Sequence, residues 1–242
     1  MFDFKKGWLI TKRELSLNWT MFIWSTIFML YMGAVIGFLY FTQGYVQEES
    51  RLTHTLLDFI LLLIAPLLGI DYSRRAFRLW QEDSYRKQMQ YYRALPIPFA
   101  AVLGSRLQIL LMSLIYNSIL VFTLTYAIGI RTIPEVTFSG YLAFVLTTIG
   151  FGLLLTALYI YWEYMVNYKR YVFWSSISTI LIVAITITSM NLGWNIANRM
   201  LALSIRDGLA SPLMWIGLVA GIAALTLSFT IVSRKAKTRD LL

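Results

Sequence analysis

The sequence contains no cysteine, only one histidine and few charged side chains. Without cysteine the chain has neither a disulfide framework nor a thiolate metal site, and the cysteine content does not indicate a redox compartment. The single histidine, His54, excludes metal sites built on a pair of histidines. Charged residues make up 14% of the 242 residues, whereas soluble domains carry about 25%. Because so little charge cannot solvate a globule of this size, we expect lipid to cover much of the surface.

The sequence also lacks the common motifs of nucleotide binding and hydrolysis. It contains no G-x-x-x-x-G-K-S/T phosphate loop, no G-x-S-x-G nucleophile turn and no H-E-x-x-H zinc motif. We therefore expect that this chain is not an enzyme and has no catalytic residues, no cofactor site and no metal site. If the protein uses ATP, another subunit must bind the nucleotide.

Hydrophobic residues make up 58% of the chain, and they gather in six long runs. Each run is long enough, at about 20 residues, to cross a bilayer as a helix. The predicted spans are residues 21–42, 55–71, 107–130, 138–161, 172–191 and 212–233. The second span is the shortest. We predict an all-α polytopic membrane protein in which residues 1–242 form a single transmembrane domain.

The basic residues are distributed unevenly between the predicted connections. Seventeen of the 21 Lys and Arg residues fall in residues 1–20, 71–106, 162–171 and the tail after 233. The other four fall in the alternate connections: Arg51, Arg131, Arg199 and Arg206. Cytoplasmic loops carry the excess of positive charge, so both termini are predicted to be cytoplasmic. The net charge of +9 thus indicates membrane orientation, and we expect lipid as a partner but no nucleic acid.

Residues 1–20 form an amphipathic segment ahead of the first span. One helical face carries Phe4, Trp8, Thr11, Leu15 and Trp19. The basic residues lie off that face: Lys5, Lys6, Lys12 and Arg13. This pattern is typical of a helix that lies in the membrane interface with its basic side among anionic headgroups. Such a helix can brace a cytoplasmic assembly or simply anchor the topology.

Residues 71–106 form a long basic insert between the second and third spans. Residues 72–93 contain no proline or glycine, which predicts a helical continuation of the second span and a short helix near 87–94. Pro96 and Pro98 then interrupt the helix. The insert presents residue types that are enriched at protein interfaces: Tyr85, Tyr91, Tyr92 and Arg93. Orientation alone explains its charge, but not its length, because helix connections in bundles usually take about 2–8 residues.

The order of these features resembles the permease subunit of ABC-2 type ATP-binding-cassette exporters. The resemblance rests on Lys12-Arg13-Glu14-Leu15 in a basic amino-terminal helix, on six spans, and on a long loop that ends in Leu95-Pro96-Ile97 before Arg106. The layout matches over the whole chain, and the motifs match over about 25 residues. Lys87-Gln88-Met89 stands where family members often carry a Gly-Thr pair.

The resemblance implies a mechanism and a set of contacts. In the family the amino-terminal helix is an elbow helix, and the loop forms a coupling helix that fits a groove on a separate ATPase. Two permease subunits, identical or sister chains, work with two ATPases, which bind ATP and Mg. The implied ATPase contacts are Tyr85, Gln88, Met89, Tyr91, Tyr92, Arg93, Leu95, Pro96 and Ile97. The implied elbow residues are Trp8, Lys12, Arg13, Leu15 and Trp19. The location implied is the cell membrane of a bacterium.

Two polar residues within predicted spans are candidates for a transport pathway. Asp58 is the carboxylate within a span, and an ionisable group there is often functional. It lies four residues after His54, so the two side chains can also pair near the headgroups. Asn117 is expected to hydrogen-bond between helices or to contact a substrate. Asp58 motivates an alternative function, an ion-coupled secondary transporter; a third possibility is a scaffold or resistance protein that acts by binding alone.

Several other polar residues have structural predictions. Thr147, Thr148 and Thr156 are expected to form hydrogen bonds between helices, and Glu163 is expected to form a surface ion pair beside Lys169 and Arg170.

Residues 192–211 are predicted to form either a short amphipathic outer helix or an interfacial loop. The packed side of the helix would carry Ile196, Met200, Leu203 and Ser204.

Two G-x-x-x-G pairs, Gly33/Gly37 and Gly217/Gly221, predict close helix packing within or between subunits.

Overall fold

The computed structural model describes residues 3–45, 51–70, 87, 90–92 and 97–238, and every regular element in these ranges is helical. The α-helices are α1 (Phe4–Leu17), α2 (Thr20–Tyr45), α3 (Arg51–Leu67), α6 (Phe99–Ile128), α7 (Phe138–Met165), α8 (Tyr168–Asn191), α9 (Ile196–Asp207) and α10 (Pro212–Thr238). The described residues also include two short 3₁₀ turns, η1 (Ile130–Thr132) and η2 (Gly208–Ala210).

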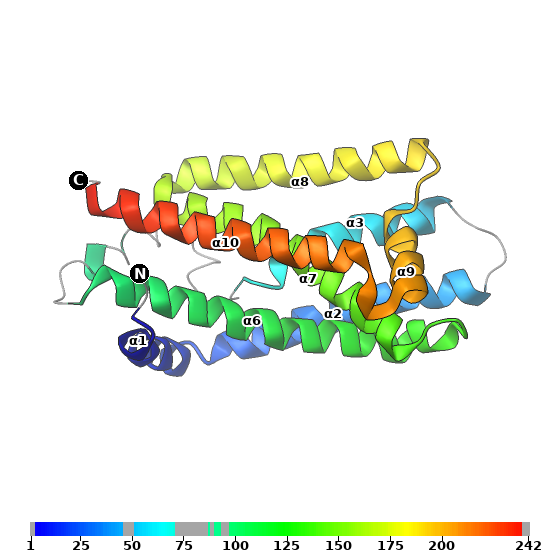
Figure 1. Ribbon diagram of the computed structural model, residues 1–242, viewed down its shortest axis with the longest axis horizontal. Coiled ribbons are helices and arrows are strands. Elements are labelled where there is room, and N and C mark those ends of the chain that lie inside the picture. The colour runs from blue at the N-terminus through cyan, green and yellow to red at the C-terminus, as the bar shows by residue number, and fades with distance from the viewer. Residues whose placement is uncertain (1–2, 46–50, 71–86, 88–89, 93–96, 239–242) are drawn as a thin grey trace.

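Five helices are long and apolar enough to cross a membrane: α2, α6, α7, α8 and α10. They run along the long axis of the molecule (Figure 1). The chain is therefore a multi-pass membrane protein. All five overlap predicted spans, although α6 begins at Phe99, eight residues before the predicted start of the third span.

The two ends of the bundle differ in charge. Figure 1 shows that α1, the start of α6 and both chain ends gather at one end, and that α9 lies across the bundle toward the other end. We call the first the basic end, because it holds these described basic residues: Lys5, Lys6, Lys12, Arg13, Arg106, Lys169, Arg170, Arg234 and Lys235. The second, the α9 end, holds Arg51, Arg131, Arg199 and Arg206. Which end of the bundle faces the cytoplasm stays a prediction.

The first glycine pair packs α2 tightly against α6. A Cβ atom added at Gly33 would lie 2.6 Å from the carbonyl oxygen of Val121, and one added at Gly37 would lie 2.9 Å from Cβ of Ile128. The Thr125 hydroxyl donates a hydrogen bond of 3.2 Å to the Gly33 carbonyl across the same contact. This pair therefore packs within the subunit.

The second glycine pair packs α10 against α7. A Cβ atom added at Gly150 would lie 2.5 Å from the carbonyl carbon of Gly217, and one added at Gly221 would lie 2.6 Å from the Gly150 carbonyl oxygen. The Ser228 hydroxyl donates to the Ala157 carbonyl at 2.8 Å farther along the same contact. Both predicted glycine motifs thus hold helices of one chain together.

The helix α3 has the same length as its predicted span of 55–71 but begins and ends four residues earlier in the chain. It has 17 residues, contains Pro66 and ends at Leu67, and a turn follows at residues 68–69. The predicted helical continuation of this span into the insert is therefore wrong at this point. Pro66 removes one helical N–H, and Gly69 lies so close to Thr156 that an added Cβ atom would be 3.1 Å from its methyl group. Figure 1 shows α3 running from the α9 end only partway along the bundle.

Candidate functional site at the basic end

The amino-terminal helix α1 is seated on the start of α6 through small residues. Gly7 is buried, and an added Cβ atom would lie 2.9 Å from the backbone nitrogen of Ser105. Thr11 is fully buried and donates to the Gln108 carboxamide oxygen at 2.9 Å. Gln108 in turn donates to the Phe4 carbonyl at 3.0 Å. The close backbone approach and the paired polar groups fix the position of α1 against α6.

The outer surface of α1 keeps its aromatic and basic side chains exposed. Trp8 is 47% exposed, and Lys12 and Arg13 are exposed as well; Trp19, which is 62% exposed, lies in the turn after α1 and not in the helix. Leu15 is half-buried. The helix lies across the bundle axis, so Figure 1 shows it nearly end-on. An exposed tryptophan and basic groups on a helix in this position suit the headgroup layer of a membrane.

One predicted member of this surface lies elsewhere. Thr11 was placed by its spacing on the same face as Trp8, but it is buried against α6. The buried side of α1 is the row of Gly7 and Thr11, next to the aromatic row. Two small residues four positions apart are a sequence signal for close helix contact. The regular spacing of the aromatic residues instead suggested that Thr11 belongs to the aromatic face.

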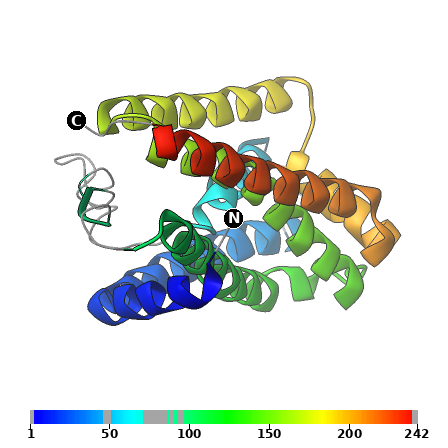
Figure 2. The ribbon, with the colours of Figure 1, turned by 60° about the vertical axis from the view of Figure 1, so that its left-hand side comes forward.

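The described part of the insert contacts α1. Gln90 to Tyr92 are helical, and the Tyr92 hydroxyl donates a short hydrogen bond to the Glu14 carboxylate. Tyr91 is 52% exposed, and its ring centroid lies 5.7 Å from that of Tyr92. Figure 2 shows this turn at the same end of the molecule as α1. Ile97 is half-buried just before α6.

The remaining predicted contact residues of the insert lie outside the described residues: Tyr85, Gln88, Met89, Arg93, Leu95 and Pro96. The structure therefore brings Tyr92 to α1 with Tyr91 beside it, and the role of all nine residues as ATPase contacts stays a prediction.

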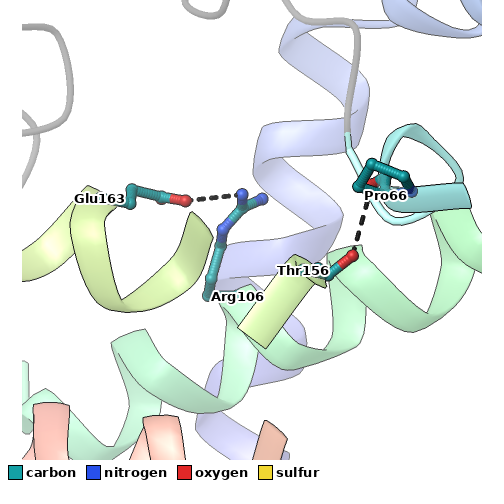
Figure 3. A network of polar contacts seen from close by, with 4 residues as sticks. All are labelled: Pro66, Arg106, Thr156 and Glu163. Atoms are coloured by element: carbon teal, nitrogen blue, oxygen red, sulfur yellow. Dashed lines mark hydrogen bonds and ion pairs between the residues drawn. The ribbon is translucent and has the colours of Figure 1, made fainter. Parts of the chain in front are cut away.

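An ion pair joins α6 to α7 beside this contact. Nη2 of Arg106 lies 2.8 Å from Oε2 of Glu163, and the two side chains are only 13% and 7% exposed (Figure 3). The predicted surface pairing of Glu163 beside Lys169 and Arg170 is wrong, because its carboxylate points into the bundle toward α6. In a chain with few charges, a largely desolvated pair of this kind ties its two helices together at a defined height.

Deeper in the bundle, Asn117 holds the end of α3. Its side-chain nitrogen donates to the carbonyls of Leu68 and Ile70 at 3.0 and 3.4 Å, where the helical hydrogen bonds stop. Thr156 of α7 donates to the Pro66 carbonyl at 3.3 Å (Figure 3). Carbonyl groups left over at a helix end need such partners in lipid. The hydrogen bonds of Asn117 thus agree with the predicted interhelical role.

The other two threonines of α7 behave differently from the prediction. Thr147 and Thr148 donate to the Ala143 and Phe144 carbonyls of their own helix, so among the three only Thr156 forms a hydrogen bond between helices.

The second pathway candidate, Asp58, docks α9 onto α3. Its side chain is 2% exposed and accepts hydrogen bonds from the backbone N–H groups of Ile196 at 2.9 Å and Ala197 at 2.8 Å. The Ser189 hydroxyl lies 3.4 Å away. Asp58 therefore caps the amino terminus of α9 from a neighbouring helix, as a local Asp or Asn would do from the preceding residue.

The predicted pairing of Asp58 with His54 is wrong. The Nδ1 atom of His54 lies 3.0 Å from the side-chain nitrogen of Asn198, so both members of the expected pair bind α9 instead.

Residues 192–211 were predicted to form either an outer helix or a loop, and the helix α9 (Ile196–Asp207) is present there. The residues that α9 buries differ from the predicted set. Ala197, Met200, Leu201 and Ser204 are buried, whereas Leu203 is 37% exposed.

Comparison of the chain with protein-family models, with curated proteins and with solved structures finds no match.

Proposed function

We propose that this chain is the permease subunit of an ABC-2 type exporter in the plasma membrane of a bacterium. In this proposal α3 is the short second of six spans, α1 is the elbow helix, and the termini and the insert are cytoplasmic. Two separate ATPase subunits hold ATP and Mg, and a second permease subunit, identical or a sister chain, completes the pathway. The chain itself hydrolyses nothing.

The observation that carries the proposal is the contact between the insert and α1 at the basic end. A connection of more than 30 residues needs a function beyond joining two helices. Tyr92 and Glu14 link it to a helix that is itself seated on α6. The exposed Tyr91 leaves an aromatic side chain available to a partner at the same place. Tyrosine is among the residues that contribute most at protein interfaces.

A continuous series of contacts connects the insert with the spans. It passes from Tyr92 to Glu14, across α1 to the Thr11–Gln108 hydrogen bond on α6, and within two residues to the Arg106–Glu163 pair on α7. When ATP draws the two ATPases together, the insert moves with them, and α1, α6 and α7 shift as connected bodies. ATP binding then biases the bundle between two conformations.

The test is capture of the motor from native membranes with this chain as bait. We expect a soluble protein with a phosphate loop to co-purify, and Tyr91→Ala to lower its recovery at least fivefold. Tyr31→Ala is the matched control, because Tyr31 is a 63% exposed tyrosine in the middle of α2. Reproducible absence of such a protein, or equal recovery with both variants, would count against the proposal. Transport driven by an ion gradient without ATP would favour the carrier alternative.

A further inference from the structure

A cavity of about 430 Å³ lies at the α9 end, opposite α1 and the insert. It is formed by the first turn of α3, the end of α8 and the connection from α8 to α9, and its polar lining includes Arg51, His54, Asn191 and Asn195. Sites for small ligands usually measure about 300–1,000 Å³. None of these four side chains takes part in the contacts described at the basic end.

The end of α8 shapes one wall of the cavity. Gly193 has a φ of +68°, in the left-handed region that favours glycine, and its N–H donates to the Met190 carbonyl at 3.1 Å. The Trp194 N–H donates to the Ser189 carbonyl at 2.8 Å, which completes a Schellman turn. The chain reverses there, so Asn191 before the turn and Asn195 after it line the same cavity.

Asn195 lies at the residue preceding α9, where an asparagine side chain usually caps the helix. Its side chain makes no capping hydrogen bond, because the carboxylate of Asp58 takes the Ile196 and Ala197 N–H groups instead. The carboxamide of Asn195 is therefore available to the cavity. Asp58 thus caps α9, and Asn195 lines the cavity.

The orientation of the His54 ring is also set from outside the cavity. The side-chain nitrogen of Asn198 donates to Nδ1 of His54 at 3.0 Å. In the neutral ring the proton then lies on Nε2, which makes His54 a hydrogen-bond donor.

The described lining carries one positively charged side chain, that of Arg51. Arg51 is exposed at the start of α3, and Glu48 and Glu49, which precede it in the sequence, lie outside the described residues. None of the described lining residues is acidic. The nearby Asp58 carboxylate accepts its hydrogen bonds from α9.

We propose that this cavity binds a phosphate group. A guanidinium suits phosphate oxygens because it can offer two parallel N–H groups, and His54 and the two carboxamides add further donors. The cavity lies at the end of α8, and the end of a helix that spans the membrane is at the depth of lipid headgroups. An anionic phospholipid or free phosphate can supply the group. This inference holds whether or not the chain is an exporter subunit.

The experiment measures thermal unfolding of the full chain by tryptophan fluorescence in an uncharged detergent. One arm titrates inorganic phosphate against sodium chloride at constant ionic strength. The other compares short-chain phosphatidylglycerol with a short-chain diacylglycerol, which has the same chains but no phosphate, in mixed micelles. The variants are Arg51→Gln and Asn195→Asp, and Arg131→Gln is the control, because it removes an exposed arginine from the same end but outside the cavity. Asn195→Asp keeps a good capping residue before α9 and places a negative charge in the cavity.

We expect the wild-type chain and Arg131→Gln to be stabilised in at least one arm, with half-saturation at the same concentration. Arg51→Gln should weaken that affinity at least tenfold, and Asn195→Asp should abolish the stabilisation. Stabilisation by phosphatidylglycerol alone identifies a lipid headgroup, and stabilisation by phosphate at submillimolar concentration identifies the free ion. The proposal is overturned if neither ligand stabilises the wild type more than its control does. It is also overturned if Arg51→Gln and Asn195→Asp respond like Arg131→Gln.

Discussion

The ion pair between Arg106 and Glu163 allows a quantitative test of how α6 and α7 are held at the basic end. Removing one partner of a buried ion pair costs about 3–5 kcal/mol, because the other charge stays buried. Here the side chains are 13% and 7% exposed, and Gln retains an oxygen that can accept from the guanidinium. For Glu163→Gln we therefore expect a loss near the lower limit, about 3 kcal/mol.

The assay is thermal unfolding in detergent for Glu163→Gln, Arg106→Gln and the double variant. For a chain of this size about 1 kcal/mol corresponds to about 2–4 °C, so each single variant should unfold about 6–12 °C below the wild type. The double variant should lose less than the sum, with a coupling of about 2 kcal/mol, because it leaves no unpaired charge. Glu135→Gln is the control, since Glu135 is exposed in the connection before α7 and should change stability by less than about 0.5 kcal/mol. Additive effects, or single losses no larger than that of Glu135→Gln, would refute the assignment of this pair as a link between the helices.

Three further predictions follow from contacts elsewhere in the bundle. Asp58→Asn should cost about 2 kcal/mol by removing the charge that holds the α9 N–H groups, and it should raise hydrogen exchange at Ile196 and Ala197; unchanged exchange there would refute the cap. Gly150→Ala should destabilise by about 2 kcal/mol because its Cβ atom would meet the α10 backbone, whereas Gly217→Ala on the same interface meets no atom closer than 3.8 Å and should be close to neutral in thermal unfolding. Tyr92→Phe should cost less than about 1 kcal/mol in global stability but speed proteolysis within the insert, and equal cleavage of both proteins would contradict the contact with α1.

Much of the membrane layout could be predicted from the sequence because hydrophobic length and basic charge depend only on composition along the chain. The five long helices match predicted spans for this reason. The second span was placed less well: Pro66 and Gly69 lie inside the predicted 55–71, and both are local signals that the helix ends early. These two residues indicate a helix end near Leu67, which places the whole 17-residue helix four residues closer to the amino terminus.

The site residues were harder to predict because their roles come from other helices. Asp58 has the same four-residue spacing to His54 that suggests a pair, yet the N–H groups of α9 attract its carboxylate. Glu163 has basic neighbours in the sequence, but it forms its ion pair with Arg106, which is 57 residues away in the chain. Spacing along one helix cannot indicate either choice, because both depend on how separate helices meet.

The central claim is that force applied to the insert moves the spans, and a distance measurement tests it without knowledge of the substrate. The chain has no cysteine, so single cysteines at the exposed Lys12 and Lys169 can carry spin labels with no background. In the complex with the captured ATPase, the account predicts that a non-hydrolysable ATP analogue changes the Lys12–Lys169 distance within one subunit, and that Tyr91→Ala weakens this change. A distance that is the same with and without nucleotide, in a complex that binds it, would contradict the account.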